Sequence, residues 1–159
     1  MKICFSLILI ASCVFCQGQT LSTAFKNEEI ISSTDLRCGG KPFNLAVIYR
    51  NEKKHINLTS KNKLIKTIDL PTQSDFKGFS LNWAKKTKEG FELSVEYGSR
   101  IYFQISFSFV CNKNEFYLRR IKTNTFDKAN PETTWKTHNE KIIPNLSLEK
   151  FEITDYLKL

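Results

Sequence analysis

Apolar and polar residues alternate with a period of two over much of this chain, which is the pattern of half-buried strands in an antiparallel sheet. The clearest case is residues 91–97, Phe-Glu-Leu-Ser-Val-Glu-Tyr, where every second side chain is apolar. Residues 101–110 continue the pattern and place five apolar side chains on one face: Ile101, Phe103, Ile105, Phe107 and Phe109. Gly98-Ser99 lies between the two runs and is typical of a hairpin turn. We therefore expect residues 91–110 to form a β-hairpin.

Further runs extend this hairpin in both directions. Residues 115–125 follow it across Asn112-Lys113-Asn114, and residues 78–87 precede it across Lys88-Glu89-Gly90. In the run at 78–87, Phe79, Leu81 and Trp83 are in phase and are predicted to face the core. Shorter runs lie at residues 43–50, 54–59 and 63–70. Because every connection is short, we expect an all-β or β-rich α+β domain, an antiparallel up-and-down meander of about seven strands that closes as a barrel or a sandwich.

The two ends of the chain are candidates for covering the sheet. Residues 21–31 are weakly amphipathic and predict a short helix. Near the other end, Ser147 is predicted to cap a turn, after which Ile153, Tyr156 and Leu157 would make apolar contacts. Residues 127–141 are polar and predict a long loop.

Residues 1–18 have the form of an export signal, with Lys2 as the basic start and an apolar run at residues 3–10 that is too short for a permanent membrane anchor. Ordinary cleavage would leave a soluble protein, and we expect residues 19–159 to form one extracytoplasmic domain, periplasmic or secreted. Residues 9–13, Leu-Ile-Ala-Ser-Cys, also resemble a bacterial lipobox, in which Cys13 would be lipidated and tether the chain to a membrane. An uncleaved apolar helix is the third alternative.

Two of the five cysteines remain once residues 1–18 are set aside, Cys38 and Cys111. An exported protein meets an oxidising compartment, so an even pair predicts a disulfide. Such a disulfide would close the long loop between Cys38 and Cys111 and restrict the unfolded chain, which is expected to stabilise the fold by about 4 kcal/mol. A zinc site is not expected, because the chain has no CxxC motif and only two histidines.

No arrangement typical of catalysis is visible, and we expect neither an enzyme nor a cofactor. His55 lies beside Lys53 and Lys54 and is interpreted as a solvated residue, as is His138 in the polar stretch. Neither histidine is accompanied by a GxSxG motif. Glu92 and Glu96 lie on the same outward strand face about 13 Å apart, which is longer than the carboxylate spacings of glycosidases.

Basic charge is the main indication of a partner. The formal net charge is +8, and it falls to +7 when Lys2 is removed with the signal. Lysine and arginine recur in short clusters at residues 53–54, 61–66, 85–88 and 119–122. If these clusters meet at one end of the sheet, they would form a positive patch that attracts an acidic protein, an anionic lipid or a glycan. The candidate contact residues are Lys85, Lys86, Lys88, Arg119, Arg120 and Lys122. The alternative is that these side chains serve solubility and edge protection.

The aromatic residues admit two interpretations. Inward-facing Phe79, Phe91, Phe103, Phe107 and Phe116 either pack as a core or line a ligand pocket. Trp135 lies in the polar stretch and is a candidate interface anchor.

Three functional classes follow from these patterns. The first is an exported, non-enzymatic binding protein that engages an acidic protein partner, such as a periplasmic immunity or inhibitor protein. The second is a small-ligand carrier with a lipocalin-like barrel, or a lipid-tethered protein with an interaction role. The third is a secreted enzyme of an unrecognised kind. Nucleic acid is not expected as a partner, because an exported protein rarely meets it and no RNA-binding signature is present.

Overall fold

The structure is a computed structural model that describes residues 28–130, 132 and 134–157. The described chain is nearly all antiparallel β-strand, as the alternating pattern predicts. The export signal at residues 1–18, including Cys13, and most of the predicted N-terminal helix lie outside the described residues. No helix in the described ranges has the length and apolar character needed to cross a bilayer.

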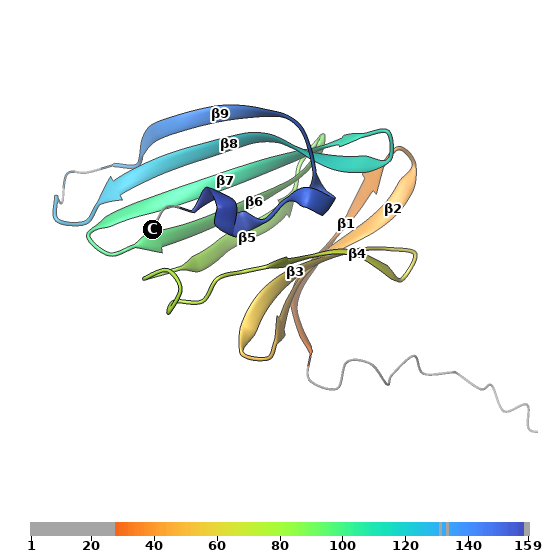
Figure 1. The fold of residues 1–159 in the computed structure, drawn as a ribbon, viewed down its shortest axis with the longest axis horizontal. Coiled ribbons are helices and arrows are strands. Elements are labelled where there is room, and N and C mark those ends of the chain that lie inside the picture. The colour runs from red at the N-terminus through yellow and green to blue at the C-terminus, as the bar shows by residue number, and fades with distance from the viewer. Residues whose placement is uncertain (1–27, 131, 133, 158–159) are drawn as a thin grey trace, which may run out of the picture.

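Within the described residues, nine strands form two sheets in simple chain order. Sheet A contains β1 (Glu29–Cys38), β2 (Lys41–Arg50), β3 (Lys53–Ser60) and β4 (Lys63–Asp69). Sheet B contains β5 (Ser80–Lys86), β6 (Gly90–Gly98), β7 (Ile101–Asn112), β8 (Glu115–Asp127) and β9 (Lys136–Ser147). In Figure 1, sheet B crosses the upper part of the view and β1–β3 run downward from its right-hand side. Two short 3₁₀ turns follow, η1 (Leu148–Lys150) and η2 (Ile153–Tyr156).

The seven predicted strands correspond to β2–β8, and the meander is confirmed. Tight two-residue turns hold its register. Both turn residues have positive φ in the β1–β2, β2–β3, β3–β4 and β7–β8 hairpins, which is the type I′ geometry that matches strand twist. The β3–β4 and β7–β8 turns use the same dipeptide, Lys61-Asn62 and Lys113-Asn114, in the same conformation.

Two edge strands were not predicted, β1 and β9. Residues 29–31 belong to β1 rather than to a helix, and the stretch predicted as a loop is strand from Lys136 onward. Both strands contribute little to the core. In β1 only Leu36 and Cys38 are buried, and Ile142 of β9 is 63% exposed. Backbone pairing to a single neighbour holds each of them, so their sequences lack the alternation of a half-buried strand.

The environment of two residues differs from the prediction. A β-bulge between Leu81 and Trp83 shifts the phase of β5, so Trp83 lies on the outer face and its Nε1–H donates to Glu92 Oε1 at 2.9 Å. Ile101, at the start of β7, is 48% exposed instead of joining the core. The inward positions of Phe91, Phe107 and the other phenylalanines further along the strands agree with the prediction.

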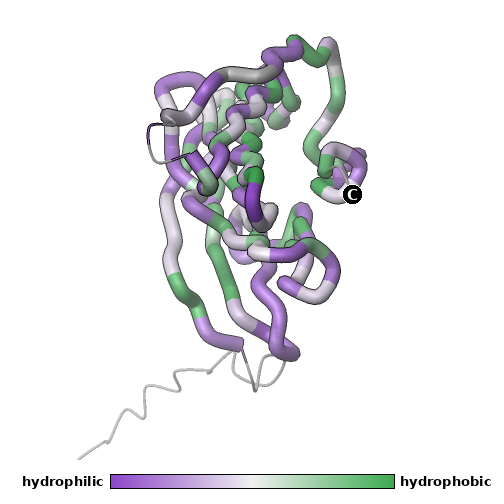
Figure 2. Tube along the Cα trace, turned by 90° about the vertical axis from the view of Figure 1, so that its left-hand side faces the viewer, coloured by the Kyte–Doolittle hydropathy of each residue, from purple (hydrophilic) through white to green (hydrophobic). Residues whose placement is uncertain are grey.

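One hydrophobic core lies between the two sheets, with buried residues from both. The C-terminal segment, residues 148–157, completes it by contributing Leu148, Phe151, Ile153 and Leu157. Figure 2 shows apolar positions alternating along the strands and recurring in this segment. The turn predicted after Ser147 is present, but the Ser147 hydroxyl makes no capping hydrogen bond.

Candidate functional site

Four hairpin turns meet at one end of the molecule. In a meander, alternate turns lie at the same end, which gathers the β1–β2, β3–β4, β5–β6 and β7–β8 turns. We call their residues, 37–41, 60–63, 86–90 and 112–115, the basic end. Figure 1 shows the β1–β2, β3–β4 and β7–β8 turns together at the right-hand side of the molecule. Residues far apart in the sequence and from both sheets thus share one surface.

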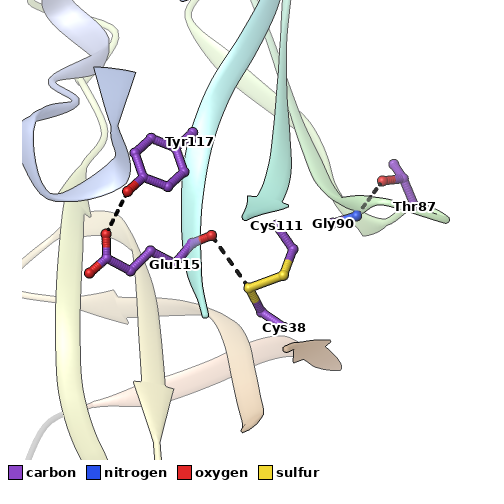
Figure 3. The surroundings of a disulfide bond; sticks show 6 residues. All are labelled: Cys38, Thr87, Gly90, Cys111, Glu115 and Tyr117. Atoms are coloured by element: carbon purple, nitrogen blue, oxygen red, sulfur yellow. Dashed lines mark hydrogen bonds between the residues drawn. A yellow bond between two sulfur atoms is a disulfide. The ribbon is translucent and has the colours of Figure 1, made fainter. Parts of the chain in front are cut away.

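Covalent and polar contacts fix these turns relative to one another (Figure 3). The predicted disulfide between Cys38 and Cys111 is present and joins the end of β1 to the end of β7, with a Cα–Cα distance of 5.3 Å. Next to it, Gly39 lies so close to the Asn114 side chain that any Cβ at position 39 would overlap the amide. The Cys111 N–H donates to the Glu89 carbonyl at 2.8 Å, which ties the β5–β6 turn to β7.

The fourth turn, β3–β4, is attached through sheet A. The Ser60 hydroxyl donates to the Pro42 carbonyl oxygen at 2.7 Å, which links this turn to the start of β2. Phe43, one residue further on, packs edge-on against Phe116 of β8 with ring centroids 5.2 Å apart. All four turns are therefore braced against the same part of the core.

The basic end concentrates positive charge. It carries seven exposed cations: Arg37, Lys41, Lys61, Lys63, Lys86, Lys88 and Lys113. Its acidic residues are Glu89 and Glu115, so seven positive charges less two negative charges leave a net charge of +5. In the part of the chain that the structure describes, none of the seven cations lies within 4 Å of a carboxylate. Their charge is available to a partner.

The carboxylate of Glu115 is engaged by a neighbour on its own strand. The Tyr117 hydroxyl donates to Glu115 Oε2 at 2.8 Å (Figure 3). This hydrogen bond to the carboxylate, aided by partial desolvation and the nearby negative charges, raises the pKa of Tyr117. The Glu115 carboxylate thus binds a phenol and leaves the lysines of the basic end unpaired.

The six predicted cationic contact residues are divided between two surfaces. Lys86 and Lys88 belong to the basic end. Lys85 lies on the outer face of sheet B, where its Nζ is 3.3 Å from Glu92 Oε1 and 4.5 Å from the centroid of Trp83. Arg119, Arg120 and Lys122 lie along β8, and Arg120 pairs with Glu140 at 3.4 Å.

Trp135 lies at the opposite end of sheet B, beside the start of β9. Its ring packs against Phe126 with centroids 5.4 Å apart, and the residue remains 43% exposed. The structure therefore does not bring Trp135 together with Lys86 and Lys88.

Arg37, Lys41 and Lys113 were not predicted as members of this surface. Each lies next to a turn signal, Gly39-Gly40 or Asn112 and Asn114, so a list of the residues flanking every second turn would have found them.

His55 is not the solvated residue that its lysine neighbours suggested. It is only 9% exposed, because it lies on β3 between the neighbouring strands β2 and β4. Its Nδ1 lies 2.7 Å from Asp69 Oδ1 and its Nε2 lies 3.3 Å from the Arg50 carbonyl oxygen. Both ring nitrogens thus have structural partners. His138 lies in β9 rather than in a loop.

Within residues 28–130, 132 and 134–157, no group of three His, Cys, Asp or Glu side chains is placed to hold a metal ion. Comparison of the chain with protein-family models, with curated proteins and with solved structures finds no match.

Proposed function

We propose that this protein is an exported, non-enzymatic binding protein that engages an acidic surface of another protein through the basic end. The observation that carries the proposal is the arrangement of seven exposed, unpaired cations on four turns from both sheets, beside the Cys38–Cys111 disulfide. An immunity or inhibitor protein with an acidic target is the class that fits best.

Rigidity supports this proposal. Binding costs conformational entropy when flexible segments must be ordered, and preorganised groups reduce that cost. The turns of the basic end are short, and the disulfide, the Gly39–Asn114 contact and the Ser60–Pro42 hydrogen bond brace them. A fixed array of like charges also steers an oppositely charged partner during encounter.

The contacts of His55 favour binding over catalysis. A histidine that acts as a general base must have a ring nitrogen within reach of the proton it abstracts. Asp69 and the Arg50 carbonyl occupy both nitrogens of His55, and the residue is part of the strand pairing of sheet A.

The interior of the fold favours core packing over a lipocalin-like cavity. Phe91 stacks on Phe109 with centroids 4.6 Å apart, and Phe151 of the C-terminal segment packs edge-on against Phe107 and Phe109. Of the rings predicted either to pack or to line a pocket, Phe91, Phe107 and Phe116 are buried in the core. A lipid-tethered form would depend on Cys13, outside the described residues.

Charge reversal at two sets of positions, with the same change in net charge, tests the proposal. One variant changes four lysines of the basic end to glutamate, and a matched control changes four exposed lysines elsewhere. The first set is Lys41, Lys61, Lys88 and Lys113; the control set is Lys53, Lys54, Lys136 and Lys141. Binding of a deca-glutamate peptide, the probe for an acidic protein segment, is measured by isothermal titration calorimetry at low salt. We expect the basic-end variant to lose about 80-fold in affinity, since four exposed charge contacts at about threefold each multiply to that figure.

The control variant is expected to lose less than about threefold, because its lysines lie away from the four turns. Equal losses in both variants would show that net charge alone attracts the peptide and would reject the basic end as a site. Tighter binding of a sulfated glycan or of phosphatidylglycerol vesicles than of the peptide would reject a protein partner.

A further inference from the structure

We propose that a second site, at the end of sheet B opposite the basic end, binds a small anionic amphiphile, a carboxylate attached to an apolar chain. The site is a groove of about 600 Å³ between residues 75–77, in the β4–β5 connection, and the β6–β7 hairpin. This volume lies within the usual range for small-molecule sites. The groove shares no residue with the basic end.

Aromatic and aliphatic side chains form the floor of the groove. Tyr97 and Phe103 stack with ring centroids 5.5 Å apart, and Phe76 packs edge-on against Tyr97 at 5.5 Å. Phe76 and Phe103 are only partly buried, and Ile101 beside them is 48% exposed. Phe103 and Ile101 lie on the inward face of β7, past the part of that face that the C-terminal segment covers. The groove therefore offers apolar surface that the protein itself leaves in contact with water.

A loop held by backbone hydrogen bonds forms one wall. The Phe76 N–H donates to the Thr72 carbonyl at 3.1 Å, and the Gly98 N–H donates to the Lys77 carbonyl at 2.7 Å, which fastens the loop to the β6–β7 hairpin. Gly78 permits this approach, because its φ is +68° and a Cβ there would lie 2.6 Å from the Gly98 carbonyl oxygen. The wall is thus formed by fixed backbone and not by a closing lid.

Charge at the groove selects an anion. Lys77 and Arg100 line it; Lys77 is exposed and lies within 4 Å of no carboxylate of the described residues, and the Arg100 Nε lies 3.7 Å from Asp127 Oδ1. The remaining charged lining residue is Asp75. Its Oδ2 accepts hydrogen bonds from the Thr72 N–H and hydroxyl, both at 2.8 Å, and these bonds lower its pKa. Asp75 therefore holds the loop, Arg100 shares its charge with Asp127, and Lys77 is the lining cation that is free to pair with a ligand.

An apolar floor beside two cations matches a ligand with one anionic end and one apolar end. A purely apolar ligand would leave Lys77 without a partner, and a small hydrophilic anion would leave the aromatic floor in contact with water. Burial of a methylene group contributes about fourfold in affinity, so chain length has a measurable effect. The head group and the chain can thus be tested separately.

Calorimetric titration with four probes tests the site: dodecanoate, octanoate, dodecanol and dodecyltrimethylammonium. We expect dodecanoate to bind about tenfold more tightly than dodecanol, and about 250-fold more tightly than octanoate, which lacks four methylene groups at about fourfold each. Dodecyltrimethylammonium should bind more weakly than dodecanol. The double variant K77Q/R100Q should bind dodecanoate no better than dodecanol. Both substitutions are at exposed positions, and a near-ultraviolet circular dichroism spectrum like that of the native protein establishes that the variant is folded.

The matched control is K141Q/K150Q, which removes the same charge from exposed positions outside both the groove and the basic end and should bind dodecanoate as the native protein does. Equal binding of dodecanoate and dodecyltrimethylammonium would overturn the proposal, as would equal losses in the two double variants. Binding only to phosphatidylglycerol vesicles, without binding of monomeric dodecanoate, would replace the small-ligand site with a membrane contact and would also overturn it. Failure of the dodecanoate titrations would leave the proposal for the basic end unchanged, because that proposal is tested with the deca-glutamate peptide.

Discussion

Replacing Cys38 and Cys111 together with alanine is expected to lower the free energy of unfolding by about 4 kcal/mol, the chain-entropy contribution of a crosslink that closes so long a loop. Their sequence separation is 73 residues, and the bond joins sheet A to sheet B. Urea unfolding followed by circular dichroism measures the change. Dithiothreitol should destabilise the native protein by a similar amount and leave the double variant unaffected.

The same variant should also bind the deca-glutamate peptide more weakly, because the β1–β2 turn loses its covalent link to β7 at the basic end. A loss of less than about 1 kcal/mol on either treatment would contradict this role. It would mean that packing around Phe43 and Phe116 positions the two sheets without the crosslink.

Phe151→Ala is expected to cost about 3–5 kcal/mol, the usual range for removing a buried phenylalanine side chain. Phe151 is fully buried, packs edge-on against Phe107 and Phe109, and stacks on Tyr156 at 5.6 Å. The C-terminal segment that carries it is fastened to β4 by Lys66, whose Nζ donates to the Glu149 carbonyl at 3.1 Å. Truncating Phe151 would thus leave a cavity between the sheets and loosen the segment.

Lys150→Ala is the matched control for this prediction. Lys150 is exposed in the same segment, so its substitution should change the free energy of unfolding by no more than about 0.5 kcal/mol. Chemical unfolding of both variants provides the comparison. If Phe151→Ala behaves like the control, the segment contributes nothing to the core.

The alternating pattern in the sequence predicts the strands that bury one face, but it does not reveal the edge strands β1 and β9. The alternation in residues 91–97 and 101–110 exists because one face of β6 and β7 must avoid water, so the pattern records the structure directly. Strands β1 and β9 bury few side chains and are held by backbone hydrogen bonds, which any sequence can make. The inverted face of Trp83 depends on a bulge, a backbone irregularity with no hydrophobic signature.

Only part of the candidate site was predicted, and the rest was missed for a similar reason. Positive charge at turns is visible in the sequence, and Lys86 and Lys88 were identified from it. Whether a cation is unpaired depends on cross-strand neighbours. Register places Glu92 opposite Lys85, and it places Glu140 close enough to pair with Arg120 across the β8–β9 ladder. The burial of His55 arises in the same way from its partners on β2 and β4.

A ¹⁵N–¹H NMR titration of the protein with the deca-glutamate peptide locates the binding surface directly. We expect the largest chemical-shift changes at the amides of residues 39–41, 61–63, 87–90 and 112–115, and their disappearance in the basic-end variant. Changes centred on the β2–β3 turn at Lys53 and Lys54, or spread evenly over all lysines, would contradict the assignment of the basic end as the surface that binds an acidic partner.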